Sequence, residues 1–194
     1  MGLRDILTGR HAVKGPAPDR MFAISTAYVT LESAHQIAPA GKAAIVFQAL
    51  ATSEFEATLK EMEEVVSATG GESGTTVATQ DDSYGYRWMV MKNPVGAPSV
   101  EDLAVAINAV SGSIETAGHG ERLLCAVFAF VDAQSHPVYF IYNYKRGYWY
   151  PFVPAAGDQQ RSTERELQIK AQIGEELPIE PEIERWFPLW GIPI

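Results

Sequence analysis

The sequence predicts an α+β domain in which helices pack against an antiparallel sheet. Apolar residues recur at helical spacing in several segments, while other segments are apolar or alternating runs of strand length. Short turns join consecutive strands as hairpins, so the strands come in groups and do not alternate strictly with helices. The predicted order is helix, helix, strand; helix and two strands; helix and three strands; and a last helix. This grouping favours an antiparallel sheet in a single domain over a doubly wound parallel sheet.

The predicted elements follow from apolar periodicity and from the Gly and Pro residues between the segments. They are a helix over 26–37, a strand over 43–50, a helix from Ser53 to Gly70, hairpin strands over 75–79 and 84–91, a helix from Ser99 to Gly118, strands over 123–131, 138–144 and 148–153, and a helix over 163–173. Residues 21–176 therefore make up the predicted globular domain.

Three helix starts carry local capping signals, and two breaks are expected. Ser53 with Glu56, Ser99 with Asp102 and Thr163 with Glu166 each place a hydroxyl three residues before an acid. Pro39 and Gly41 are expected to break the chain before the first strand. Gly70 and Gly71 are expected to end the helix that begins at Ser53.

Composition limits the class of protein. The chain has 194 residues, which suits one domain with extended termini. The net charge of -9 argues against binding of nucleic acid or anionic lipid by the surface as a whole. Cys125 is the one cysteine, so a reducing compartment is expected. No run approaches about 18 apolar residues, so the protein is predicted to be cytoplasmic, with no spanning helix.

The first 20 residues are predicted to form an amphipathic segment and a linker. Leu3, Ile6 and Leu7 fall on one side of a short helix over residues 1–10, which makes them candidates for membrane contact. A helix this short buries little apolar area. Any membrane contact is therefore expected to be weak, peripheral to the inner face of the cell membrane, and assisted by a partner.

No catalytic, cofactor-binding or metal-binding residue is predicted. Cys125 lies in an apolar strand, where a thiol is buried and unreactive. The four histidines lack metal-ligand spacing, and the glycines at 70–74 follow a helix, whereas a phosphate-binding loop follows a strand. Asp81 and Asp82 are interpreted as a solvated turn.

The segment 142–152 is the most distinctive in the chain, because basic residues and a glycine stand among many aromatic residues. It partly matches the RNA-recognition signature, but Trp149 replaces a small residue and Pro151 a central strand residue, so no nucleic acid is expected. Two interpretations remain: a hairpin with core aromatics, or a surface for a protein partner. The candidate contact residues here are Tyr144, Lys145, Arg146, Tyr148, Trp149 and Tyr150.

The tail over residues 177–194 poses a similar question. It is apolar, rich in proline and predicted to be extended, and it would form a large exposed patch if it were free in water. It is expected to pack on its own domain, or otherwise on a partner or a second copy of the chain. Trp186, Phe187 and Trp190 are its candidate contact residues.

These segments resemble the PspA-associated protein PspAB family, an accessory of the phage-shock response to envelope stress. The residues that carry the resemblance are Tyr142-Asn143-Tyr144-Lys145-Arg146-Gly147-Tyr148-Trp149-Tyr150-Pro151-Phe152-Val153-Pro154, Leu177-Pro178-Ile179-Glu180-Pro181, Arg185-Trp186-Phe187-Pro188-Leu189-Trp190-Gly191, Tyr84-Gly85-Tyr86-Arg87-Trp88, and Met1-Gly2-Leu3 with Leu7-Thr8-Gly9-Arg10. The resemblance implies a link to PspA, a coiled-coil protein that coats and remodels the inner membrane, and it implies no catalytic residues. In arrangement alone, the predicted elements are similar to the α+β domains of secretion chaperones and YbjN-type proteins.

The function expected is therefore that of a non-enzymatic accessory or regulatory protein of the phage-shock response. It would act through contacts with a PspA-like protein at the cytoplasmic face of the membrane. Two alternatives remain: a chaperone-like homodimer that binds other proteins, and a small-molecule-binding domain or enzyme. An isologous apolar interface would favour the first alternative, and a deep pocket with perturbed acids the second.

Overall fold

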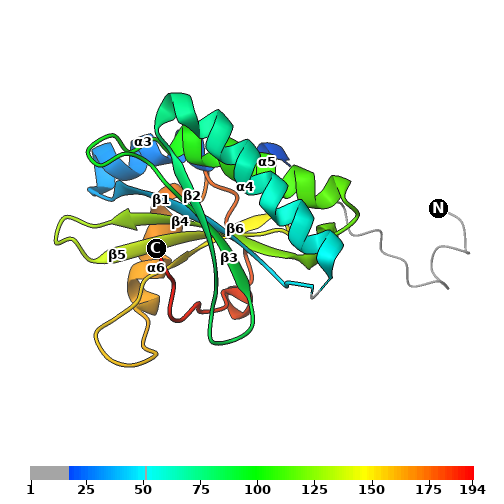
Figure 1. Cartoon of the computed structure of the whole chain (residues 1–194). Helices are drawn as coiled ribbons and strands as arrows, with labels where there is room; N and C mark the ends of the chain where they lie inside the picture. The colour runs from blue at the N-terminus through cyan, green and yellow to red at the C-terminus, as the bar shows by residue number, and fades with distance from the viewer. Residues whose placement is uncertain (1–17, 51) are drawn as a thin grey trace, which may run out of the picture.

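A computed structural model describes residues 18–50 and 52–194 (Figure 1). The elements in chain order are α2 (Pro18–Phe22), α3 (Ile24–His35), β1 (Ala38–Phe47), α4 (Ser53–Ser73), β2 (Thr76–Asp81), β3 (Arg87–Lys92), α5 (Val100–Thr116), η1 (Gly120–Arg122), β4 (Leu123–Val131), β5 (Pro137–Asn143), β6 (Tyr148–Phe152), α6 (Thr163–Ile173) and η2 (Ile183–Arg185). The α+β class is confirmed, and so is the predicted order of elements from α3 onward; the prediction of a linker up to residue 20 is wrong at its end, because α2 begins at Pro18. The amphipathic helix predicted over residues 1–10, with Leu3, Ile6 and Leu7, lies outside the described residues.

The strands form one antiparallel sheet of six, in the order β2-β3-β1-β4-β5-β6. Helices α3, α4 and α5 lie on one face of this sheet, which we call the helix face. The C-terminal tail lies on the other, which we call the tail face, while helix α6 packs against the edge strand β6 and also contacts α3 (Figure 1). β4 is central, and it is apolar throughout because both of its faces are covered.

Aromatic side chains fill the core on both faces. On the helix face, the Phe47 ring meets Phe55 of α4 edge-on at 6.0 Å, and Phe128 lies 5.6 Å from Trp149. On the tail face, Tyr150 stacks on Trp186 with ring centroids 6.5 Å apart. Such pairs add about 0.5–1.5 kcal/mol each to the free energy of burial.

Several predicted boundaries are confirmed. The strand over 123–131 and the helix over 163–173 have the predicted bounds. Ser99 caps α5, because its hydroxyl accepts a hydrogen bond from the Asp102 amide at 3.0 Å. Such a cap contributes about 1 kcal/mol.

Two predicted breaks are wrong. Pro39 and Gly41 lie inside β1, where the register against β4 shifts between Pro39 and Lys42, and the αL backbone of Gly41 (φ 66°) fits that bulge. Helix α4 passes through Gly70 and Gly71. It ends before Gly74, whose φ of 72° suits a residue that terminates a helix.

Two predicted capping boxes are also wrong, although both helices start close to the predicted residues. The cap of α4 is Thr52, whose hydroxyl accepts from the Phe55 amide at 3.3 Å, and the Glu56 carboxylate accepts instead from Arg87. α6 has no side-chain cap, because Glu166 is buried against Arg161. In both cases an arginine outside the helix binds the carboxylate: Arg87 lies 31 positions from Glu56, and Arg161 lies five positions before Glu166.

The C-terminal tail packs on its own domain. It is irregular apart from the single turn of η2, and Leu177 and Trp186 are buried. Ring contacts join it to the tail face, including Trp190 against Phe152 at 5.2 Å. The apolar tail therefore completes the core.

Candidate functional site

The tail begins as an extra strand-like segment beside β6. The Trp149 amide donates to the Pro178 carbonyl at 2.9 Å, and the Glu180 amide donates to the Trp149 carbonyl at 2.7 Å. These bonds form a parallel bridge between Trp149 and Ile179. The two segments most distinctive in the sequence are therefore paired with each other, and they cover the outer edge of the sheet.

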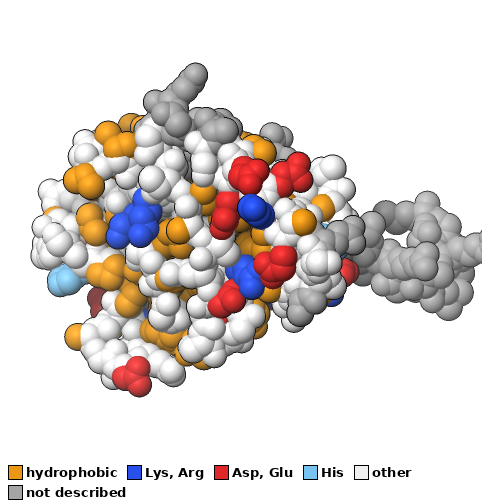
Figure 2. All heavy atoms as spheres, viewed as in Figure 1, with side chains coloured by type: hydrophobic (Ala, Val, Ile, Leu, Met, Phe, Trp, Pro, Cys, Tyr) orange, Lys and Arg blue, Asp and Glu red, His pale blue; other side chains and the backbone are white. Residues whose placement is uncertain are grey.

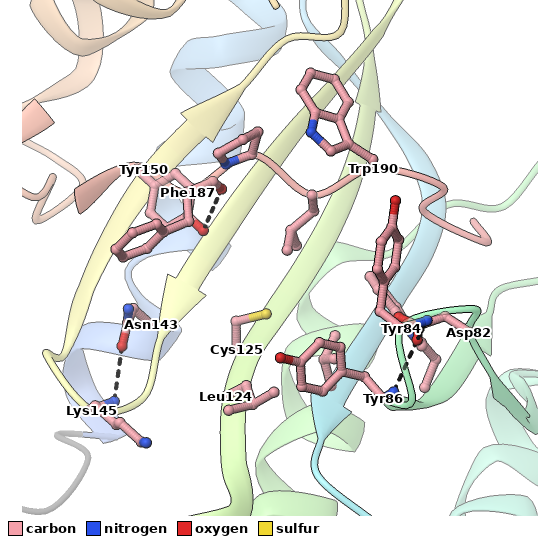
Figure 3. Close-up of a pocket in the computed structure, with 14 residues that line it drawn as sticks. Asp82, Tyr84, Tyr86, Leu124, Cys125, Asn143, Lys145, Tyr150, Phe187 and Trp190 are labelled. Carbon is pink, nitrogen blue, oxygen red and sulfur yellow. Dashed lines mark hydrogen bonds between the residues drawn. The ribbon is translucent and has the colours of Figure 1, made fainter. Parts of the chain in front are cut away.

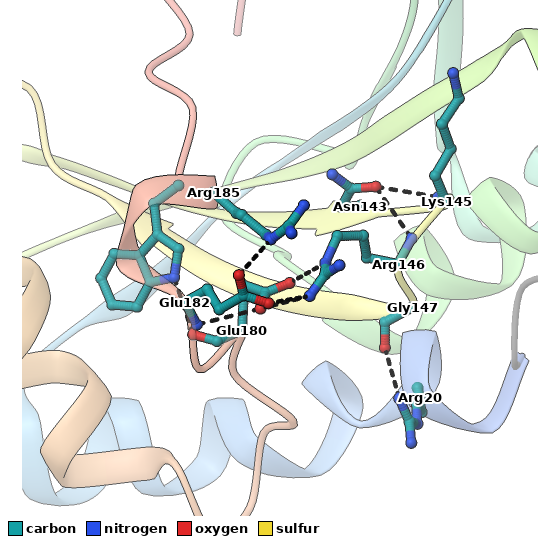
Figure 4. Close-up of polar contacts among 9 residues, drawn as sticks. Arg20, Asn143, Lys145, Arg146, Gly147, Glu180, Glu182 and Arg185 are labelled. Atoms are coloured by element: carbon teal, nitrogen blue, oxygen red, sulfur yellow. Dashed lines mark hydrogen bonds and ion pairs between the residues drawn. The ribbon is translucent and has the colours of Figure 1, made fainter.

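An ion-pair network fixes the same segments through their side chains (Figure 4). Arg146 donates Nε and Nη2 to the two carboxylate oxygens of Glu180, with an Nη2–Oε1 distance of 3.0 Å, and also contacts Glu182 at 3.0 Å. Glu180 is buried, so its charge needs this bidentate partner. Hydrogen bonding from Arg185 holds the pKa of Glu182 below its ordinary value, and Arg146 adds to this effect.

The start of the described chain is fastened to the same hairpin. Arg20 donates to the Gly147 carbonyl at 3.3 Å, and its guanidinium lies 4.8 Å from the centre of the Tyr148 ring. The Trp149 indole donates to the Arg20 carbonyl at 2.7 Å. Gly147 has a φ of 68°, which closes the hairpin turn at little steric cost.

The middle of the tail is anchored by a second arginine. Arg161 pairs with the fully buried carboxylate of Glu166 at 2.6 Å, and donates to the Trp186 carbonyl at 2.6 Å. Glu166 also accepts from the Val153 amide at 2.9 Å. Arg161 therefore connects α6, β6 and the tail.

The structure separates the candidate contact residues into two groups. Tyr144, Trp149, Tyr150 and Trp186 are buried in the core. Those accessible at the surface are Lys145, Arg146, Tyr148, Phe187 and Trp190. Arg146 is committed to Glu180 and Glu182, so a surface contact rests on the other four.

An open groove of about 390 Å³ lies on the tail face between two walls (Figure 3). One wall is the tail, and the other is the β2–β3 turn. The floor comes from β1, β3, β4 and β6, and Asn143 and Lys145 lie at the end of β5. The lining residues are Val46, Asp82, Tyr84, Tyr86, Trp88, Leu124, Cys125, Asn143, Lys145, Tyr150, Phe187, Pro188, Leu189 and Trp190. We call this the tail-face groove.

Asp82 shapes the wall formed by the β2–β3 turn. Its Oδ1 accepts from the amides of Tyr84 at 2.8 Å and Tyr86 at 2.9 Å, and its Oδ2 accepts from the Trp88 indole at 2.9 Å. Asp82 therefore lies in a turn, as predicted, and its partly exposed carboxylate also orders that turn through these three hydrogen bonds. Tyr84 and Tyr86 are 59% and 41% exposed, although their rings border the groove.

Tyr84 and Tyr86 are candidate residues that residue-level reasoning missed. The signal available in the sequence was the segment Tyr84-Gly85-Tyr86-Arg87-Trp88 itself, whose alternation places two tyrosines on one side of a turn. Phe187, 58% exposed, faces the groove from the opposite wall. Aromatic residues with this degree of exposure dominate binding energies when a partner covers them.

The lining of the groove is mostly aromatic and aliphatic. Burial raises the pKa of the Cys125 thiol on the floor to about 12, so it is a poor nucleophile. Within residues 18–50 and 52–194, no group of three His, Cys, Asp or Glu residues is placed to hold a metal ion. Lys145 is exposed at one end of the groove and makes no ion pair with a described residue.

Over α4 and the neighbouring strands, acidic and basic side chains are interspersed on the face shown in Figure 2. Arg87 there bridges Asp81 at 2.7 Å and Glu56 at 2.6 Å. In the part of the chain that the structure describes, no helix is long and apolar enough to cross a membrane.

Comparison with known proteins gives one finding. A family model described as PspAB, PspA associated protein B, matches residues 1–194, which is the whole chain. No curated protein and no solved structure matches the chain.

Proposed function

We propose a function for this chain, which belongs to the PspA-associated protein B family. It is a non-enzymatic accessory protein, and it binds PspA through the tail-face groove. Family membership links its role to PspA. The proposal adds the mode of action: a protein–protein contact in the envelope-stress response, made at the cytoplasmic face of the membrane.

The observation that carries the proposal is the convergence of three distant segments on one groove. Residues 84–88, 142–154 and 177–191 are far apart in the sequence, and each supplies lining residues to the groove. The ion pairs of Arg146 and the bridge at Trp149 hold two of these segments together. These long-range bonds fix the positions of the segments that form the groove. Its exposed aromatic residues are unfavourable in water, and a contiguous exposed apolar patch of this kind marks an interaction site.

The groove fits the apolar stripe of a helix. Its volume of about 390 Å³ lies within the range of pockets that take up ligands or anchoring side chains. Its lining is aromatic and aliphatic, and the helix-in-groove mode uses anchors of this kind at i, i+3 and i+4. The unpaired charge of Lys145 at one end favours an acidic residue beside that stripe.

The direct test is the affinity of the purified chain for PspA. Replacing Tyr84 and Phe187 together by alanine removes two exposed aromatic side chains from opposite walls and leaves the core intact. We expect the dissociation constant to rise at least tenfold, because a central aromatic contact contributes about 2 kcal/mol or more. Trp149 is unsuitable as a test residue, because it is fully buried and its replacement by alanine would cost about 3–5 kcal/mol of stability.

A matched control uses apolar residues that are exposed elsewhere. Val95 and Val105 are 105% and 53% exposed and lie outside the groove. Their double replacement by alanine should leave the affinity unchanged. Equal affinity of the groove variant and the wild type, with both folded, would refute the groove as the contact. A stable dimer in solution that buries Phe187 would favour the chaperone-like homodimer instead.

Contact with the membrane is the second part of the proposal, and it is carried by the amphipathic pattern of Leu3 and Ile6. Replacing both by aspartate should abolish co-sedimentation with liposomes, because apolar burial at the interface is then lost. Unchanged co-sedimentation would leave the PspA contact standing and remove the membrane contact.

A further inference from the structure

A second cavity, separate from the tail-face groove, lies on the helix face. It has a volume of about 240 Å³ and sits between the C-terminal half of α5, the end of β5 and Met21 of α2. None of its lining residues lines the tail-face groove. A role for this cavity therefore goes beyond the proposed PspA contact.

One stripe of α5 forms a wall of the cavity. Asn108, Ser111, Gly112 and Glu115 are spaced at i, i+3, i+4 and i+7, so they share one side of the helix. The stripe is polar, whereas the stripe that packs on the sheet is apolar. A polar stripe beside a cavity is suited to a polar ligand.

Gly112 keeps this cavity open. A glycine inside a helix is less favourable than alanine by about 1 kcal/mol, so its presence needs a reason. A side-chain carbon built at Gly112 would meet no neighbouring atom within 4 Å, which shows that close packing is not that reason. The space above Gly112 is part of the cavity itself.

The floor carries a buried hydroxyl with an unmet hydrogen-bonding requirement. Tyr144 is 5% exposed, and its hydroxyl makes no hydrogen bond of standard geometry to any residue between 18 and 194 that the structure describes. Ser111 lies near it but donates to the Asn108 carbonyl at 3.1 Å. An unpaired buried hydroxyl is unfavourable, so a ligand atom that pairs with it gains binding energy.

The charge of the cavity selects the ligand. Glu115 is the one acidic residue in the lining, and the lining contains no Lys or Arg. Arg20 lies beside Gly147, close to the Tyr142 hydroxyl, but it is outside the lining and is committed to the Gly147 carbonyl and to the Tyr148 ring. Burial raises the pKa of Glu115, so its carboxylate gains from a cation placed beside it.

Aromatic rings complete the recognition of a cation. Tyr142 and Tyr144 meet edge to face with centroids 5.3 Å apart, and both line the cavity. Tyrosine rings attract ammonium groups, and the tyrosine hydroxyls accept hydrogen bonds from them.

We infer that this cavity binds a small primary alkylammonium ion, with its N–H groups shared between Glu115 and Tyr144 and its alkyl chain over Gly112. The same chemistry is offered by a free amine and by an ethanolamine lipid headgroup.

The experiment is a titration of the full chain by ¹H–¹⁵N NMR with propylammonium, 1-propanol and propionate. We expect saturable shifts centred on Gly112 with propylammonium, and affinity at least tenfold weaker for the alcohol and the anion. Equal responses to the three probes, or no saturable response to propylammonium, would overturn the inference.

Variants test the named residues. Gly112→Leu should abolish binding without unfolding the helix, since leucine is a better helix former and its Cβ would meet no neighbouring atom within 4 Å. Ser113→Leu, one residue away, should bind as the wild type does. Tyr144→Phe and Glu115→Gln should each weaken binding at least fivefold. Wild-type affinity in Gly112→Leu would refute the site.

The source of the amine is decided by vesicles. Sedimentation with phosphatidylethanolamine vesicles but not with phosphatidylcholine vesicles, lost in Gly112→Leu, would identify the lipid headgroup. Sedimentation with neither, together with binding of propylammonium, would identify a soluble amine. Loss of PspA binding in the groove variants leaves this test unaffected, because the two sites share no residue.

Discussion

The Arg161 anchor allows a quantitative test of how the tail is held. Replacing Arg161 by methionine keeps most of the apolar stem but removes the guanidinium that pairs with Glu166. Glu166 has no exposed surface, and the Val153 amide would be its one remaining partner among those described. The bond from Arg161 to the Trp186 carbonyl would also be lost.

The magnitude follows from the burial of the two partners. Removing one member of a buried ion pair costs about 3–5 kcal/mol, because the other charge is left uncompensated. The Arg161 side chain is 20% exposed, so water can enter its place, and the lower limit of about 3 kcal/mol is expected. This corresponds to about a 150-fold change in the unfolding equilibrium constant, since about 1.4 kcal/mol is tenfold.

Urea denaturation measures this loss of stability. With a slope of about 2 kcal/mol/M, the midpoint should fall by about 1.5 M. Arg165→Met is the matched control, because Arg165 bonds only to the nearby Gln168 among described partners and should change stability by less than about 0.5 kcal/mol. Adding Glu166→Gln to Arg161→Met should recover part of the loss, because the unpaired charge is removed. A loss below about 1 kcal/mol for Arg161→Met, or no recovery in the double variant, would refute the reasoning.

Three further predictions concern the turn, the thiol and an ion pair. Gly147→Ala should destabilise the fold by about 1–2 kcal/mol in the urea assay, because alanine is strained at a φ of 68°. Its methyl group would have space, since the nearest atom, the Tyr142 hydroxyl, lies at 3.7 Å. An unchanged midpoint would contradict this prediction. Cys125 should react with an aromatic disulfide reagent at pH 8 about a thousandfold more slowly than an exposed thiol, because burial raises its pKa to about 12, and an ordinary rate in the folded protein would exclude that burial. Hydrogen bonding from Arg87 lowers the pKa of Asp81 in the folded protein. The ion pair therefore contributes to folding stability above the unfolded pKa of about 3.9, and this contribution is lost as the pH falls through the lower folded pKa. Asp81→Asn should therefore lower the free energy of unfolding by about 0.5 kcal/mol at pH 7, a small value because the carboxylate is exposed. Near pH 2 the variant and the wild type should be equally stable, and a difference that persists there would argue for another cause.

Local signals in the sequence were sufficient where the structure is decided locally. The Ser99 cap, the apolar run of 123–131 and the hairpin predicted over 138–153 needed no distant partner to be recognised. Prediction failed where a tertiary contact changes the local preference. Pro39 and Gly41 are tolerated in β1 because a bulge against β4 accommodates them. Glu56 and Glu166 serve arginines instead of helix ends.

The candidate site shows the same division. The sequence alone indicated that residues 84–88, 142–154 and 177–191 were distinctive, and it gave the family resemblance that the match over the whole chain confirms. It did not indicate that Trp149 is core while Phe187 is exposed, because burial of Trp149 depends on α2 and on Pro178, 29 positions along the chain.

The sequence by itself determined the α+β class, the order of the elements from α3 onward and the acidic, apolar-tailed character of the chain. These properties depend on periodicity and composition, which are local. Only the tertiary structure decided that the tail completes the sheet, that Tyr84 and Phe187 face one groove, and that Tyr144 lies beneath an open space over Gly112. Such features arise from side chains that meet across long sequence separations, and pairing of that kind leaves no periodic signal in one sequence.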